Sequence, residues 1–120
     1  MLFDIGIIGA GSLVARELAR YELKICLVEK GNDAACGATK ANSAIIHGGF
    51  DPIPGTLKAA MNVRGVTLME KTAKELNVPY IKNGSLVTAF SEKEKSGLSE
   101  LVIRGRENGV SGLEILTGSD

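Results

Sequence analysis

The feature that most constrains the fold is a pair of short apolar runs separated by a glycine-rich turn and a helical stretch. Leu2–Ile8 is rich in isoleucine and ends at glycines, and Leu23–Glu29 is almost continuously apolar, so both runs predict buried strands. Between them, Ser12–Tyr21 has its apolar side chains near one helical face. The crossover of such a strand–helix–strand unit is right-handed, which makes the two strands parallel neighbours. The predicted fold class is therefore α/β.

The turn after the first strand carries part of the pattern G-x-G-x-x-G that is typical of dinucleotide-binding loops. Gly9 and Gly11 are in place, but Val14 stands where the third glycine belongs. The first glycine permits the tight turn, the second lets the backbone approach a pyrophosphate, and the third lets the helix pack on the strand. We expect a β-branched residue at the third position to hold the helix away from the strand.

Two further residues favour a nucleotide at this turn. Ser12 adds a hydroxyl in the first helical turn, where free N–H groups and the helix dipole attract negative charge. Glu29 ends the second strand 20 positions after Gly9, where an acidic group would bind ribose hydroxyls. These residues favour a nucleotide site, and a plain β-α-β turn without a ligand is the alternative.

The middle of the chain predicts a functional loop followed by a long helix. Residues 31–55 have many small residues and no clear periodicity, which is typical of a functional segment, with a short helical turn expected near Asn42–Ala44. Thr56 is a good N-cap for a helix that reaches about Asn77. Gly65 inside this helix costs about 1 kcal/mol relative to alanine, which predicts a close contact with another backbone or a ligand.

The remainder predicts three strands and one helix. The sequence PYIKNGSLVTAF reads as a short strand, a turn at Asn83–Gly84 and a strand over Ser85–Phe90. A capping box at Ser91–Glu94 starts a helix over Glu92–Glu107, and Leu113–Leu116 predicts a last strand. Since a doubly wound domain needs more β-α units than the first 30 residues supply, the chain reads as a piece of a larger protein or a truncated product.

Composition excludes several classes of function. With 14 basic and 14 acidic residues, the net charge of zero argues against a nucleic-acid binder. The longest apolar stretch, Ile5–Ala10, is too short to span a membrane. Cys26 and Cys36 have no metal-ligand spacing and are too few for a disulfide framework, so we expect no metal and a reducing, cytoplasmic location.

Beyond these patterns, the sequence resembles a known family. DIGIIGAG, ARELARYELKICLVEK and GATKANSAIIHGGFDPIPGTLKA resemble the N-terminus of the FAD-dependent oxidoreductases related to D-amino-acid oxidase, in the branch of glycerol-3-phosphate dehydrogenases and L-2-hydroxyglutarate oxidases. The similarity extends over essentially all 120 residues, and ANSAIIHGG with PGTLKA is more specific than the glycine loop. It implies the N-terminal part of a Rossmann-like FAD-binding domain over residues 1–78 and the start of a substrate domain over 79–120.

The resemblance also implies which residues bind the cofactor FAD. The pyrophosphate would lie at Gly9, Gly11 and Ser12, and the adenosine ribose at Glu29 with Lys30 beside it. The diphosphate or ribityl region would be contacted by Thr39, Asn42 and Ser43. The isoalloxazine ring would lie beside Ile46, His47 and Gly48. His47 is the one candidate for an acid/base group, with a flavin contact or a purely structural role as alternatives.

Family members usually place three more residues, the third glycine among them, between the second glycine and ARELARY. The loop is therefore similar to a flavin loop shortened by three residues, which keeps the helix face but removes about 4.5 Å of helix. A simple Gly→Val substitution at Val14 is the alternative.

The implied activity is the oxidation of a small molecule, glycerol 3-phosphate or a 2-hydroxy acid, by hydride transfer to the flavin. Because the family's substrate-binding residues lie mostly beyond residue 120, we expect this chain alone to be inactive. A non-catalytic remnant without flavin and a plain NAD-binding module are the alternatives. Exposed sheet edges of such a fragment predict self-association.

Overall fold

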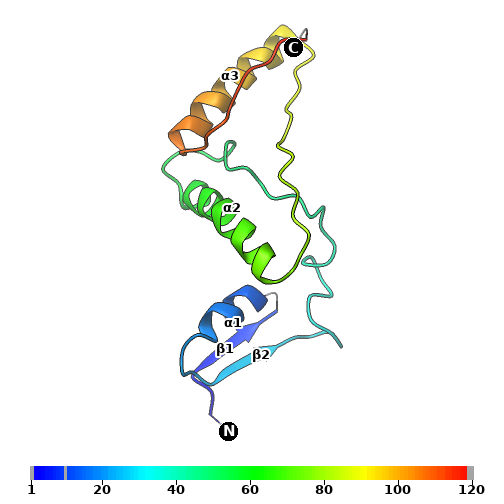
Figure 1. Ribbon diagram of the computed structural model, residues 1–120, viewed down its shortest axis with the longest axis vertical. Helices are drawn as coiled ribbons and strands as arrows, with labels where there is room; N and C mark the ends of the chain where they lie inside the picture. The colour runs from blue at the N-terminus through cyan, green and yellow to red at the C-terminus, as the bar shows by residue number, and fades with distance from the viewer. Residues whose placement is uncertain (1, 10, 119–120) are drawn as a thin grey trace. The chain divides into compact units, whose positions relative to one another are not determined.

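The structure is a computed structural model that describes residues 2–9 and 11–118. It consists of two compact units, Met1–Ile45 and Ile46–Asp120, and each is described by itself. Figure 1 shows the short strands in the first unit and the two long helices in the second. None of the described helices is both long and apolar enough to cross a lipid bilayer.

The first unit is the predicted β-α-β arrangement. Strand β1 (Ile5–Ile8) pairs in parallel with strand β2 (Ile25–Val28), and helix α1 (Ser12–Leu18) connects them. The predicted α/β class and parallel pairing are confirmed, but all three elements are shorter than predicted. At the start of the pair, the Asp4 amide donates to the Lys24 carbonyl at 2.9 Å, and the Asp4 carboxylate accepts a hydrogen bond from the Lys24 amide at 2.8 Å.

Burial in the first unit is confined to one face of β1. Ile7 is buried, whereas its neighbour Ile8 is 86% exposed, because successive side chains of a strand point to opposite faces. On β2, Leu27 and Val28 are exposed as well. The described residues thus cover only one face of a sheet whose apolar sequence predicts cover on both.

The second unit contains helices α2 (Leu57–Glu75) and α3 (Glu92–Glu107), and both are bounded by caps that the sequence encodes. The Thr56 hydroxyl accepts a hydrogen bond from the Ala59 amide at 3.3 Å, and Ser91 does the same for Glu94. At the end of α2, Asn77 takes a left-handed conformation, and the Val78 amide donates back to the Ala73 carbonyl at 2.9 Å. Both helix predictions are confirmed.

The strands predicted in the second unit do not form. Residues 78–90 and 110–117, called here the extended segments, belong to no sheet, so the predicted strands at Ser85–Phe90 and Leu113–Leu116 are wrong. Figure 1 shows residues 78–90 as irregular, drawn-out chain that leads from the end of α2 to the start of α3, and residues 110–117 as irregular chain along α3. A strand is held by hydrogen bonds to a neighbour, and no other described segment pairs with either of them.

Two smaller predictions also fail, one of them in part. Asn42–Ala44 has no helical turn, because Ala44 has a left-handed φ of 54° that interrupts a right-handed turn. The close contact of Gly65 with another backbone is not found among the described residues, since a Cβ built on Gly65 would meet nothing within 4 Å, and a contact with a ligand stays a prediction.

Candidate functional site

The first candidate site lies where β1 and β2 end. Ile8 of β1 is paired with Val28 of β2, so the residues that follow them, Gly9 and Glu29, leave the sheet at the same edge. The Gly9 amide extends the ladder by one bond of 2.9 Å to the Val28 carbonyl. Carboxyl ends of parallel strands are the usual place for ligands in α/β folds. The structure therefore brings the glycine turn and the acidic residue together, as the sequence predicts.

Each glycine of the turn has a task that a larger residue could not perform. Gly9 has a φ of +76°, the left-handed region that favours glycine, and the space beside it is open. The Gly11 amide donates to the Gly9 carbonyl at 2.8 Å, which closes a tight turn. A Cβ on Gly11 would lie 2.0 Å from the Ile7 Cγ2. Gly11 thus provides the close packing on β1 that the pattern assigns to its third glycine.

Helix α1 begins at Ser12, directly after this turn. Gly11 is its N-cap without a side-chain cap, and no acidic residue lies in the first turn to repel a phosphate. The helix has only 7 residues, so it is about 10 Å long. Val14 is 56% exposed, so the expected wedge between helix and strand is not found.

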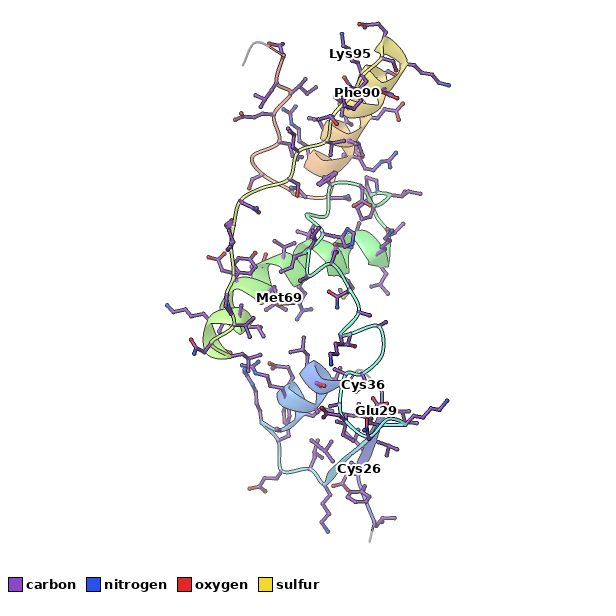
Figure 2. All side chains as sticks on the ribbon, turned by 90° about the vertical axis from the view of Figure 1, so that its right-hand side faces the viewer. Cys26, Glu29, Cys36, Met69, Phe90 and Lys95 are labelled. Carbon is purple, nitrogen blue, oxygen red and sulfur yellow. The ribbon has the colours of Figure 1, made fainter. Side chains whose placement is uncertain are left out.

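The Glu29 carboxylate is held by the backbone that follows it. Its Oε1 accepts hydrogen bonds from the amides of Lys30 at 2.7 Å and Gly31 at 3.0 Å. Its Oε2 has no partner in the part of the chain that the structure describes. Figure 2 shows Glu29 near Cys36, and the Cβ of Cys36 and the Glu29 Oε1 both lie within 4 Å of a Cβ built on Gly31. One oxygen therefore fixes the side chain and the other is available to a ligand.

Asn42 shapes the loop that follows β2. Its side-chain amide donates to the carbonyls of Ala38 and Thr39, and its Oδ1 accepts from the Ala44 amide at 2.8 Å. The side chains of Thr39 and Ser43, like that of Lys30, are exposed and make no hydrogen bond within the described ranges. The sequence predicts Asn42 as a cofactor contact but does not predict this role in the loop.

The remaining three predicted residues, Ile46, His47 and Gly48, open the second unit. His47 is exposed, while Ile46 and Gly48 are half-buried. A Cβ on Gly48 would lie 3.1 Å from the Phe50 ring, and one on Gly49 would lie 2.8 Å from the Val63 Cγ2. Packing inside the unit and a φ of +84° thus favour glycine at Gly49, and Gly48 is in close contact with the Phe50 ring.

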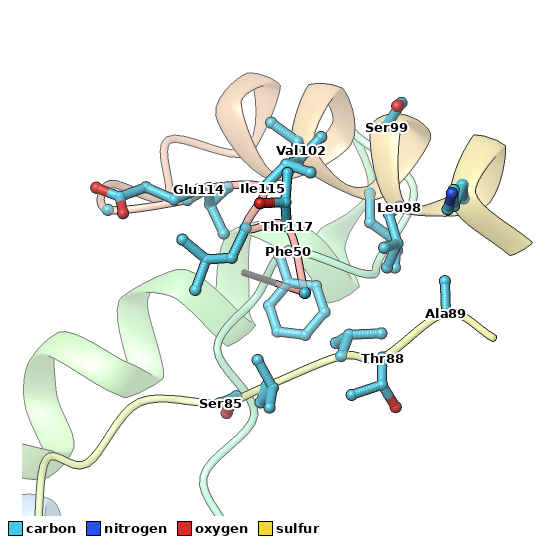
Figure 3. Close-up of a pocket in the computed structure, with 18 of the residues that line it drawn as sticks. Phe50, Ser85, Thr88, Ala89, Leu98, Ser99, Val102, Glu114, Ile115 and Thr117 are labelled. Atoms are coloured by element: carbon cyan, nitrogen blue, oxygen red, sulfur yellow. The ribbon is translucent and has the colours of Figure 1, made fainter. Parts of the chain in front are cut away.

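A hollow of about 900 Å³ lies elsewhere in the second unit and includes none of the predicted site residues. As Figure 3 shows, the extended segments and α3 surround it, and the Phe50 ring lies between the two extended segments. Its lining is mostly apolar, and charged groups do not converge on it. We therefore assign no chemistry to it. In residues 2–9 and 11–118, no cluster of three or more His, Cys, Asp or Glu side chains could hold a metal ion.

Sequence reasoning missed one group of polar residues. Asn108 and Arg104 belong to no functional motif of the sequence, but both hydrogen-bond to the loop that follows His47. These contacts join residues more than 50 positions apart, as the 59 between Asn108 and Gly49 illustrate, so no local sequence signal could have revealed them.

Comparison with known proteins shows which family the chain is similar to. A family profile described as FAD dependent oxidoreductase matches residues 4–120. The chain is 47% identical over 119 residues to the glycerol 3-phosphate dehydrogenase of Caloramator mitchellensis. The matched region covers 97% of this chain and 25% of that protein. It is 36% identical to the mitochondrial L-2-hydroxyglutarate dehydrogenase of Nematostella vectensis, over 95% of this chain and 26% of the relative.

A third relative, the glycerol 3-phosphate oxidase of Mycoplasma genitalium, is 38% identical over 89% of this chain and 29% of its own length. The chain thus spans about a quarter of the length of the curated relatives that it matches.

Proposed function

Since the chain belongs to the family of FAD-dependent oxidoreductases, we propose that its first unit binds the adenosine diphosphate half of FAD. We propose further that the whole protein oxidises glycerol 3-phosphate or a 2-hydroxy acid. The relatives named for these two kinds of substrate support the second proposal. When bound, FAD supplies the redox chemistry by accepting a hydride, and the residues of this chain hold and orient it.

The observation that carries the proposal is the shared edge of Gly9 and Glu29. The open space beside Gly9 leaves room for a pyrophosphate, which would accept hydrogen bonds from the first amides of α1 and the Ser12 hydroxyl. The unpartnered Glu29 Oε2 would accept a hydrogen bond from a ribose hydroxyl, with Lys30 beside it. The residues present therefore fit the adenosine diphosphate half of FAD.

The rest of the cofactor would follow the chain. In this proposal the free hydroxyls of Thr39 and Ser43 bind the diphosphate or ribityl region, and Asn42 keeps their loop in shape. Three residues accompany the isoalloxazine ring, namely Ile46, His47 and Gly48. His47 is the candidate donor or acid/base group there. The division into an FAD-binding part, 1–78, and a substrate part, 79–120, stays a prediction about the longer protein.

We propose that this chain by itself has no oxidoreductase activity. The matched relatives have about three quarters of their length outside the similarity. In the described residues, no cluster of charged groups faces the hollow of the second unit that could recognise a phosphate or a carboxylate. An assay of the purified chain with FAD, an artificial electron acceptor and either substrate should show no turnover, and measurable turnover would contradict the proposal.

The cofactor proposal is tested by equilibrium dialysis of the chain against FAD, FMN and NAD. FAD should bind and FMN should not, because FMN lacks the adenosine that Glu29 would contact. Glu29→Ala should weaken FAD binding by about tenfold, the effect of one hydrogen bond to a charged group. Glu22→Ala, on an exposed residue of the same unit, is the matched control and should change nothing. Tighter binding of NAD than of FAD would indicate a plain NAD-binding module.

A second candidate function is a remnant that keeps the fold without flavin. The observation that favours it is the short helix α1, because few aligned peptide units leave a weak positive end for the phosphates. Failure of the chain to take up FAD in the same dialysis experiment would favour this candidate and overturn the first.

We also propose that the isolated chain self-associates. Leu86 is 79% exposed and Phe90 is 91% exposed on the extended segments, and Figure 2 shows Phe90 next to α3. Analytical ultracentrifugation should give a mass above the 12.6 kDa of one chain, and Phe90→Asp should weaken association about tenfold. Leu57→Asp, at another exposed apolar position, is the control. A monomer at all concentrations would contradict self-association.

A further inference from the structure

The loop that follows His47 is held by two side chains at the C-terminal end of α3, Arg104 of its last turn and the C-cap residue Asn108. The Asn108 Nδ2 donates to the Gly49 carbonyl at 3.0 Å and to the Pro52 carbonyl at 2.8 Å. The Arg104 Nη1 donates to the Asp51 carbonyl at 3.0 Å. Three carbonyls of one short loop are thus bound by donors from one helix end, in a set of contacts called here the loop clamp.

Close packing on two sides holds the same loop. A Cβ on the buried Gly105 would lie 2.9 Å from the Phe50 Cβ and 3.3 Å from its Cα, so only glycine lets α3 approach this closely. On the other side, Gly49 has a φ of +84°, and a Cβ there would lie 2.8 Å from the Val63 Cγ2 of α2. The loop is therefore packed between α2 and α3 as well as hydrogen-bonded.

The end of α3 leaves the side chain of Asn108 free for this role. Gly109 takes a left-handed conformation with a φ of +82°, and its amide donates to the Arg106 carbonyl at 2.9 Å. The Val110 amide donates to the Gly105 carbonyl at 2.9 Å. Since backbone amides satisfy these terminal carbonyls, the side-chain amide of Asn108 is not used by its own helix and instead donates to the loop.

His47 itself has no hydrogen-bond partner in residues 2–9 and 11–118, so its position depends on the backbone beside it. That backbone leads within two residues to Gly49, the first carbonyl that Asn108 binds. We propose that Asn108, with Arg104, is a positioning residue: it fixes the loop from Gly49 to Pro52 and thereby sets where His47 lies for the flavin. The flavin part of this inference depends on the proposed function, and the loop part does not.

The experiment uses the fact that His47 is the only histidine, so the chain gives one imidazole Cε1–H signal by NMR. Asn108→Asp keeps the shape of the side chain but removes both donors. It should shift the His47 signal and speed hydrogen exchange in the peptide that covers residues 48–53 about tenfold. Asn83→Asp makes the same change of charge at an exposed position of an extended segment and should alter neither readout. Asn108→Gln, which retains the amide, should restore part of the exchange protection.

A second variant keeps the test decisive if Asn108→Asp disturbs the end of α3. Arg104→Met keeps the aliphatic stem and removes the single donor to Asp51, so it should move the same two readouts by a smaller amount. Unchanged His47 signal and unchanged exchange in both variants would overturn the loop clamp. An equal response to Asn83→Asp would overturn it too.

The link to the flavin is tested separately, with the chain loaded with FAD. Asn108→Asp should alter the visible absorption of bound flavin, whereas Asn83→Asp should not. An unchanged flavin spectrum together with a shifted His47 signal would overturn the positioning role while leaving FAD binding intact. Failure of the unaltered chain to bind FAD would contradict the proposed function and overturn the flavin part of the inference, and the readouts without cofactor would still decide the loop clamp.

Discussion

Two regions of the molecule are rich in apolar and β-branched residues but differ in structure. In the first unit, Ile5–Ile8 and Ile25–Val28 form a parallel ladder. In the second, Ser85–Phe90 and Leu113–Leu116 lie beside α3 without any ladder. The difference is a partner: each strand of the first unit has its neighbour within 20 residues, and neither extended segment pairs with the other.

The helices show the other side of this comparison. All backbone hydrogen bonds of a helix are made within its own segment, so α2 and α3 form wherever their caps and sequence allow. A strand makes all of its ladder hydrogen bonds with neighbouring strands. In this chain, α2 and α3 form because their hydrogen bonds are local, and the extended segments stay irregular because a ladder would need a distant partner.

The largest expected effect comes from proline placed in each kind of segment. Ser99→Pro, inside α3, should lower the free energy of unfolding by about 3 kcal/mol, because it removes a helical hydrogen bond and clashes with the preceding turn. Thr88→Pro, in an extended segment, should cost less than about 0.5 kcal/mol, since its amide has no ladder partner to lose. Urea unfolding followed by far-ultraviolet circular dichroism measures both.

Equal losses in these two proline variants would break the comparison. Such a result would mean that Thr88 takes part in a ladder in solution, so that the extended segments are paired after all.

A smaller effect is expected at the cap of α2. Thr56→Ala should destabilise the second unit by about 1 kcal/mol, because the Ala59 amide loses its acceptor. Thr67→Ala is the control, since the Thr67 hydroxyl donates to the Val63 carbonyl inside the helix and caps nothing. The same unfolding measurement applies, and a loss at Thr67 as large as at Thr56 would show that capping does not set the boundary.

The smallest effect, of opposite sign, is expected inside α2. Gly65→Ala should raise the free energy of unfolding by about 0.7 kcal/mol, because alanine is the better helix former and a Cβ there meets nothing within 4 Å. Thermal unfolding should show a higher midpoint. A destabilised variant would instead reveal a close contact at Gly65, as its place in the sequence first suggested.

How far the sequence predicts the fold follows from the same comparison. The bounds of α3 follow from the capping box at Ser91–Glu94 and from Asn108–Gly109, all within one stretch of sequence. The parallel pairing of β1 and β2 follows from one short β-α-β unit. The apolar pattern of Ser85–Phe90 predicts only that this segment suits a sheet, and a strand forms only when a partner is present.

The candidate site divides in the same way. Gly9 and Glu29 are predictable as neighbours, because parallel strands in register bring their ends together. The roles of Gly11 against Ile7 and of Asn42 in its loop depend on backbone conformation that residue type alone does not fix. The bonds of Asn108 depend on how α3 packs against a loop more than 50 residues earlier, at Gly49 and Pro52, so they could only be read from the structure.

Hydrogen exchange of the whole chain, measured peptide by peptide with mass spectrometry, compares the two kinds of segment in one experiment. Amides of α2, α3 and the β1–β2 pair should exchange at least about tenfold more slowly than those of residues 79–89 and 111–116, because only the former have backbone partners. Equal protection in the extended segments would contradict the claim that they have no pairing partner among the residues that the structure describes.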